Sequence, residues 1–229
     1  MTDQPPHRGG CLALLGGGEF TFGETEMVDQ VWLERCPPGP IGFVPAASGS
    51  VDYGRHFADY LGRAFARQVE LIPIYRERDA RRGRNAERIL GCAAVYLGGG
   101  VAEQLLDALV GSPAAQALAS KLAGGGVVVA IAAAAQACGV AARSVAGDRV
   151  LPGLRLMPEG VIEPNFDPGH DRRLRRLLTA SGAKFGLGLP AGSALLLGAG
   201  GEFEAVGTVF RLTDGEADLE PLIEEGSGG

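Results

Sequence analysis

The sequence lacks the features of several protein classes. Lys and Arg total 21 against 27 Asp and Glu, a formal net charge of −6, and no basic stripe interrupts this balance. Without such a stripe the chain has no electrostatic footprint for a phosphate backbone or an anionic membrane. No window reaches the roughly 18 apolar residues that cross a bilayer, and the first residues lack the apolar core of a secretory signal. We therefore predict no nucleic-acid or membrane partner and a cytoplasmic location.

Cysteine is scarce, and none of it forms a pattern. The chain has no CxxC pair and no Cys/His cluster, and three of its cysteines lie in apolar runs. This usage predicts buried free thiols, with neither disulfides nor a metal site. The cysteines are Cys11, Cys36, Cys92 and Cys138.

Glycine and hydrophobic residues are abundant instead. The 37 Gly and 14 Pro predict many tight turns, and 46% hydrophobic residues suffice for a full core. A length of 229 residues fits a single α/β domain, which we place at 10–223. The polar or Gly-rich ends, 1–9 and 224–229, are predicted to be flexible.

Apolar runs alternate with segments of helical period in the first two thirds of the chain. Such a βα rhythm predicts a mainly parallel sheet between two helix layers, a three-layer α/β/α fold. The predicted strands are Cys11–Leu15, Ile41–Val44, Val69–Ile74, Ala93–Leu97 and Val127–Ile131. The predicted inner helix faces are Phe57, Tyr60, Leu61 and Phe65, and then Leu105, Leu106, Leu109 and Val110.

The rhythm changes after about residue 145. Pro and Gly interrupt 151–162, and one more amphipathic helix follows, with Leu174, Leu177 and Leu178 on its inner side. Three or four short strands between Phe185 and Leu212 then predict an antiparallel extension at the sheet edge.

Sites in an open parallel sheet form at the carboxyl ends of the strands. Two such ends carry Gly16–Gly18 and Gly98–Gly100, but neither has the GxGxxG spacing of a dinucleotide site. We read these glycines as tight turns with exposed amides and predict no cofactor.

A third strand end is built almost entirely from small residues. The run GGVVVAIAAAAQACG over 125–139 leads a buried strand into a helix. A nucleophile elbow needs small neighbours of this kind, because its turn is strained. Ala132 stands where a Ser or Cys would act and offers only a methyl group.

Six segments of the chain, in the order in which they occur, resemble those of one known family. The order is similar to that of the serine peptidases that include dipeptidase E, an aspartyl dipeptidase, and cyanophycinase. The resemblance implies a flavodoxin-like, class I glutamine amidotransferase-like fold and covers Gly10 to about Phe210. The segments read CLALLGGGEF, IGFVPAASG, VYLGGGVAEQLLDAL, GGVVVAIAAAAQACG, GLRLMPEGVIEPNFD and GLGLPAGSALLL.

The resemblance also implies that the catalytic groups are missing. The family elbow, G-T-S-A-G-A, falls on 130–135 and puts the nucleophile at Ala132; the base histidine falls on Asn165. An Asn amide cannot take a proton near neutral pH, so it is no general base. The family's acidic run falls on Pro190–Leu195 without a carboxylate, and its usual Asn is Val101.

We therefore predict a catalytically inactive, pseudoenzyme member of this family. Amides at Gly99 or Gly100 and at Ala133 are candidates for the oxyanion pocket, with Glu19 and Ser48 as further ligand contacts. The expected ligand is a small acidic peptide or amino-acid-like compound. A homodimer is what the resemblance implies.

Two alternatives stay open. One is an active serine-type hydrolase of altered mechanism, with Ser48 as nucleophile or His170 as displaced base. The other is a structural or assembly protein that kept the scaffold for its surface.

Several further side chains have plainer interpretations. A serine of the 48–50 loop is expected to cap the helix that begins at Val51. We expect Cys138 in the core, His56 on a helix flank and His170 at an exposed helix start. The charged runs 76–84 and 171–176 are predicted to be a solvated connection and a structural or dimer-contact helix.

Overall fold

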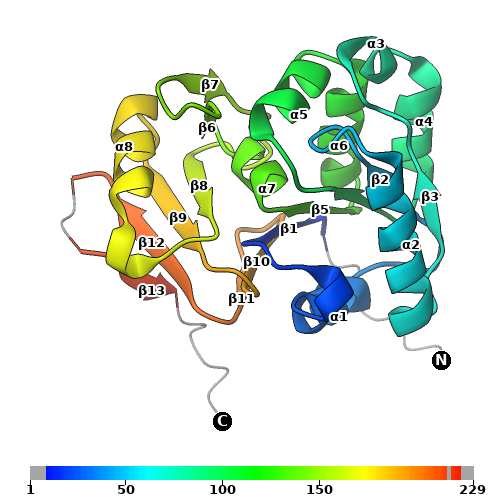
Figure 1. Cartoon of the computed structure of the whole chain (residues 1–229), viewed down its shortest axis with the longest axis horizontal. Coiled ribbons are helices and arrows are strands. Elements are labelled where there is room, and N and C mark those ends of the chain that lie inside the picture. Colours follow the sequence, from blue (N-terminus) through cyan, green and yellow to red (C-terminus); the bar gives the residue numbers. More distant parts are fainter. Residues whose placement is uncertain (1–8, 216–217, 223–229) are drawn as a thin grey trace.

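The computed structural model describes residues 9–215 and 218–222 (Figure 1). The ends predicted to be flexible, 1–8 and 224–229, lie outside the described residues, and Gly9 is described and exposed. No helix in the described part of the chain is both long and apolar enough to span a membrane.

A seven-stranded sheet forms the centre of the molecule, in the order β11-β10-β1-β5-β4-β2-β3. The five strands β1 to β5 pair in parallel, whereas β10 and β11 join antiparallel at one edge. The strands are β1 (Cys11–Leu15), β2 (Ile41–Val44), β3 (Val69–Leu71), β4 (Ala94–Leu97), β5 (Val127–Ile131), β10 (Ala194–Gly198) and β11 (Phe203–Val206). The predicted parallel sheet is thus confirmed. Strand β3 ends earlier than predicted because Pro73 has no N–H to donate.

Helices cover both faces of this sheet. Alternate residues of β1 enter two separate cores, Leu12 and Leu14 on one face and Ala13 and Leu15 on the other, as the two-residue period of a strand requires. The first face is covered by α3 (Glu77–Ala80), α4 (Gly83–Gly91), α5 (Ala102–Leu109), α6 (Pro113–Ala123) and α7 (Ala133–Ala137). The second is covered by α1 (Glu26–Glu34) and α2 (Val51–Phe65), with the short helix η1 (Phe20–Phe22).

The predicted inner helix faces hold except at one residue. Val110 is 44% exposed, because α5 ends at Leu109 and the chain turns outward through Gly111, which has a φ of 69°. The other predicted positions pack against the two cores, with Tyr60 and Phe65 only partly buried.

The predicted antiparallel extension of the central sheet is confirmed, but it accounts for only part of the last third of the chain. Strands β10 and β11 do extend the central sheet, but four other strands form a second sheet in the order β13-β12-β9-β8. Its strands β8 and β9 pair in parallel across a helical crossover. The members are β8 (Gly160–Pro164), β9 (Phe185–Leu189), β12 (Val209–Thr213) and β13 (Glu220–Leu222), with the crossover η2 (Pro168–His170) and α8 (Arg172–Ser181).

The second sheet exists because it has its own core. A Cβ on Gly186 would lie 2.7 Å from Leu174 of α8, and one on Gly188 would collide with Phe166. The two glycines of β9 thus let α8 and Phe166 pack directly on the strand and complete a third apolar cluster. Figure 1 shows this sheet and α8 at the end of the molecule opposite α2 to α4. The hairpin β6 (Ala141–Arg143) and β7 (Val150–Pro152) lies next to α8.

A buried carboxylate joins the two helices of the second face. Asp29 of α1 is fully buried and accepts hydrogen bonds from Trp32 Nε1 at 2.7 Å and from the Tyr60 hydroxyl of α2 at 2.9 Å. Burial raises the pKa of Asp29, and the hydrogen bonds from Trp32 and Tyr60 partly offset this rise.

We predict that Asp29→Ala lowers the free energy of unfolding by about 2 to 4 kcal/mol, because it leaves the buried Trp32 N–H and the partly buried Tyr60 hydroxyl without an acceptor. Asp29→Asn keeps an acceptor and is expected to lose less than half as much. Urea unfolding followed by circular dichroism measures both, with the exposed Glu34→Ala on the same helix as control. An equal effect of Asp29→Ala and Glu34→Ala would contradict this role.

The pH dependence has a defined sign. Because the folded protein holds the Asp29 proton more tightly than the unfolded chain, this group makes stability fall as pH rises from its ordinary pKa of 3.8 towards the raised folded value. We expect Asp29→Asn to flatten that part of the stability curve.

Candidate functional site

The turn between β5 and α7 has the geometry of a nucleophile elbow. Ala132 has φ 51° and ψ −118°, one of four non-glycine residues with positive φ in the described chain. Its N–H donates to the Leu15 carbonyl of β1 at 2.9 Å, and its carbonyl accepts from Gln136 at 3.1 Å. Such a conformation costs about 1 to 3 kcal/mol in a residue with a Cβ. The strained turn is therefore present with a methyl group at its apex.

Asn165 also lies at the carboxyl end of β1, next to the carbonyl that follows the one bonded to Ala132. It also has a positive φ, 48°, and its N–H donates to the Gly16 carbonyl at 2.7 Å. Its side chain rests on Gly17, where a Cβ would collide with Asn165 Oδ1. Ala132 and Asn165 are thus bonded to the adjacent carbonyls of Leu15 and Gly16, so the structure brings these two predicted positions together.

The Gly98–Gly100 turn lies beside the elbow. A Cβ on Gly99 would lie 3.6 Å from the side chain of Ile131, the residue before Ala132. Gly100 has φ 144°, and a Cβ there would collide with the Ala47 carbonyl. Among the described residues, no backbone carbonyl accepts from the N–H of Gly100 or Ala133. These amides are available to an oxygen atom of a ligand.

Tyr53 is a residue of this site that sequence reasoning missed. A Cβ on Gly99 would lie 3.7 Å from the Tyr53 hydroxyl, which comes from the first turn of α2. Burial raises the pKa of this phenol, while the Gly99 backbone acts in the opposite direction. No local pattern marks Tyr53, because in the sequence it is one more aromatic residue of an amphipathic helix.

A buried polar network holds α7, the helix that follows the elbow. Gln136 of α7 donates to Glu163 Oε2 at 3.3 Å, and Arg143 donates to Glu163 Oε1 at 2.8 Å. Gln136 is 5% exposed and Glu163 is 4% exposed. The network joins α7 to β8 and β6, and so holds in place β8, the strand that ends immediately before Asn165. Its sequence signal was a Gln within an alanine run and a Glu within an apolar strand.

The remaining pocket candidates are held by local contacts. The Ser48 hydroxyl donates to the Pro45 carbonyl at 3.2 Å, and its backbone lies against Gly100. The neighbouring Ser50 is the residue that caps α2, by accepting from the Tyr53 N–H. Glu19 is exposed and accepts from both the N–H and the hydroxyl of Thr21. Its side chain thereby caps the start of η1.

The other titratable candidates lie where their plainer interpretations put them. Cys138 is fully buried, and burial raises its pKa to about 12, so its thiol stays protonated at neutral pH. All four cysteines are free, as predicted, but Cys36 is only partly buried. His56 is exposed on α2. His170 is exposed at the end of η2, and its Nδ1 lies 2.6 Å from Asp167 Oδ2, which lowers the pKa of that carboxyl.

The run 76–84 is only partly a solvated connection. Arg81 and Glu77 form an exposed ion pair, but the run also forms α3 and buries Asp79, which pairs with Arg82.

A cavity of about 690 Å³ opens between Asn165 and α8. Its arginines Arg172, Arg173 and Arg176 have no carboxylate within 4 Å in the part of the chain that the structure describes. The lining acids, by contrast, are all engaged: Glu163 with Arg143, Asp167 with His170 and Asp171 with Arg175. The helix predicted to be structural therefore also presents unpaired positive charge to a cavity at the site.

The model of one protein family, peptidase family S51, matches residues 12–204. The chain belongs to peptidase family S51. Two solved structures have the same fold. A peptidase from an acI-B1 actinobacterium superposes with a TM-score of 0.73 at 20% identity, covering 94% of this chain and 98% of its own. A putative peptidase E protein from Listeria monocytogenes EGD-e gives 0.64 at 14% identity, over 86% and 98%. No curated protein sequence matches.

Membership of this peptidase family confirms the predicted family and fold. The match spans β1 to β11, so it includes the elbow, the second glycine turn and Asn165. At identities of 14% and 20%, the two solved structures show only that the fold is shared.

We predict that Ala132→Gly raises the free energy of unfolding by about 1 kcal/mol, because glycine adopts this φ without steric strain. The matched control is Ala133→Gly, one residue further on in ordinary helix, which should lower it by about 0.5 to 1 kcal/mol. Urea unfolding midpoints of the two variants measure the difference. If Ala132→Gly destabilised the protein as much as its control, the turn would not be strained.

Proposed function

We propose that this chain is a catalytically inactive member of its peptidase family that binds a small acidic peptide at the elbow. One observation carries the proposal: the strained turn is retained, yet its apex residue, Ala132, has no nucleophile. A strained turn without a nucleophile gains nothing for hydrolysis, whereas its free amides can still hold a ligand oxygen.

The chemistry of the second position agrees. Asn165 rests on the Gly17 backbone at the same strand end, and an amide cannot accept a proton near neutral pH. Loss of a serine nucleophile or its base costs about 10⁶-fold in turnover. From a typical turnover of about 10 per second, about 10⁻⁵ per second would remain.

The cavity beside Asn165 supports an anionic ligand. Arg172, Arg173 and Arg176 supply guanidinium groups without carboxylate partners, and such groups recognise carboxylates with paired hydrogen bonds. A peptide with an acidic side chain satisfies both features, its carbonyl at the Gly100 and Ala133 amides and its carboxylate at α8.

A second candidate, an active hydrolase of altered mechanism, has one observation in its favour. His170 lines the same cavity with Asp167 2.6 Å from its Nδ1, and a base oriented by a carboxylate is a recurrent catalytic pair. Its expected signature is turnover that a His170→Ala variant loses.

For the binding proposal we expect saturable binding of the dipeptide Asp-Leu, measured by isothermal titration calorimetry, and none of Lys-Leu. Arg172→Gln should weaken Asp-Leu at least about 10-fold, because one charge-assisted hydrogen bond is lost. The control Arg84→Gln removes the same charge from an exposed position on α4 and should leave the affinity unchanged. Equal weakening by both variants would mean that only net charge matters.

For the loss of catalysis we expect no product by mass spectrometry after long incubation with N-terminal-Asp dipeptides and cyanophycin fragments. The variant Ala132→Ser combined with Asn165→His should regain cleavage, with Ala132→Ser alone as its partner control. Cleavage by the natural chain well above about 10⁻⁵ per second would overturn the proposal and point to His170 or Ser48.

A further inference from the structure

A second basic cavity lies next to the first. It has a volume of about 360 Å³ and lies between α8 and the β6–β7 hairpin. Four arginines line it, and the only carboxylate on its wall within the described residues is Asp148. The arginines are Arg143, Arg149, Arg173 and Arg176. In a chain whose net charge is −6, this is a local excess of positive charge.

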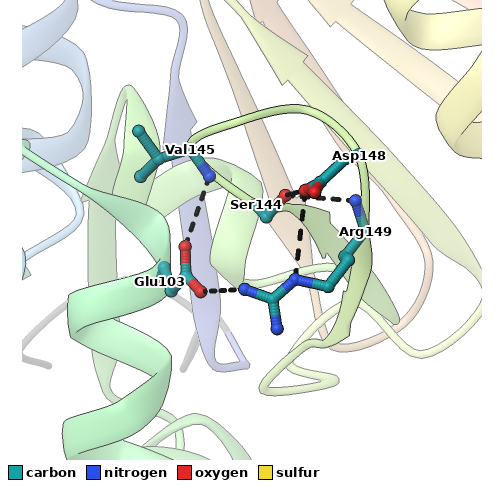
Figure 2. A network of polar contacts seen from close by, with 5 residues as sticks. All are labelled: Glu103, Ser144, Val145, Asp148 and Arg149. Carbon is teal, nitrogen blue, oxygen red and sulfur yellow. Dashed lines mark hydrogen bonds and ion pairs between the residues drawn. The ribbon is translucent and has the colours of Figure 1, made fainter.

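The hairpin wall of this cavity is fixed in place (Figure 2). Glu103 of α5 accepts from the Val145 N–H at 3.3 Å and from Arg149 Nη2 at 2.9 Å. Within the hairpin, the Ser144 hydroxyl donates to Asp148 at 2.8 Å and accepts from the Arg149 N–H at 3.1 Å. The hairpin is thereby bonded to α5, a helix that packs on the central sheet. Arg149 and Asp148 both have hydrogen-bond or ion-pair partners within this network.

The two cavities share a wall. Arg173 and Arg176 are exposed, lie three residues apart on one face of α8, and line both cavities. Neither has a carboxylate within 4 Å among the described residues. Arg172 lines only the first cavity and Ala180 only the second. The pair therefore lies between the two cavities and borders both.

Arg143 contributes charge to the second cavity, not a free donor. Its guanidinium is paired with Glu163 through Nη2, and its Nε is buried away from the cavity. Among the described residues, the unpaired guanidinium groups on the walls of the two cavities are therefore those of α8.

We infer that the two cavities form one groove for an acidic peptide longer than two residues. Successive carboxylates of the peptide would be bound by Arg172, by the shared pair Arg173 and Arg176, and by the hairpin side of the second cavity. This inference rests on the proposed function, since the first cavity is the one that reaches Asn165, and it extends the ligand class from acidic dipeptides to acidic oligopeptides.

The test compares two peptides of aspartate on the full chain. Calorimetric titration with Asp-Asp and with tetra-Asp at about 150 mM salt, where long-range charge effects are screened, gives the gain from length. We expect tetra-Asp to bind at least about 10-fold more tightly than Asp-Asp.

One variant addresses the second cavity alone. Ala180→Glu puts a negative charge on its wall at an exposed helical position, and we expect tetra-Asp to weaken at least about 10-fold, with Asp-Asp changed less than about two-fold. The matched control is Thr179→Glu, also exposed on α8, with the same charge change outside both cavities. It should leave both affinities within about two-fold. Circular dichroism checks that both variants keep the fold.

The outcomes separate this inference from the proposed function. Equal binding of the two peptides, or equal weakening of tetra-Asp by Ala180→Glu and Thr179→Glu, would overturn the extended groove while dipeptide binding stands. If neither Asp-Asp nor tetra-Asp bound, both the extended groove and the proposed binding of acidic peptides would be overturned. Saturation by inorganic phosphate with no preference for tetra-Asp would mean that the groove holds single anions and not a peptide.

Discussion

The strained turn at Ala132 is the constraint on which the site depends. Its φ of 51° occurs where the parallel pairing of β1 and β5 ends, with the Ala132 N–H on the Leu15 carbonyl and α7 beginning at the next residue. The turn also needs room, and the glycine turn over Ile131 and the alanines of α7 supply it. A nucleophile at this apex would need an oxygen or sulfur atom, whereas the side chain of Ala132 is a methyl group.

The end of β1 is where the two sheets of the molecule meet. The N–H of Gly16 donates to Ser193, the carbonyl of Gly16 accepts from Asn165, and the carbonyl of Gly17 accepts from Gly192. A Cβ on Gly16 would collide with the Pro190 carbonyl, so the second sheet can approach the first only because this position is glycine. The glycines of this turn serve backbone contact, in agreement with the absence of a dinucleotide pattern.

Charge organises what surrounds this junction. The buried Glu163 is neutralised by Arg143 and held by Gln136, whereas arginines on the outer face of α8 have no such partners. The same residue type therefore has two roles within one region: support for the strand that carries Asn165, and positive surface beside it. Asn165, whose amide cannot accept a proton near neutral pH, lines the same cavity as these arginines, which can attract a carboxylate.

The sequence by itself determined the parallel sheet, both helix layers, the family and the elbow segment, because each depends on local periodicity or on motifs contiguous in the chain. Only the tertiary structure decided that β8, β9, β12 and β13 form a second sheet, since pairing between distant strands leaves no local signal. The same holds for the Glu163 network, for Tyr53 beside Gly99, and for the groove that α8 shares with the hairpin. In each case residues far apart in sequence meet, and their chemistry arises from that meeting rather than from any one segment.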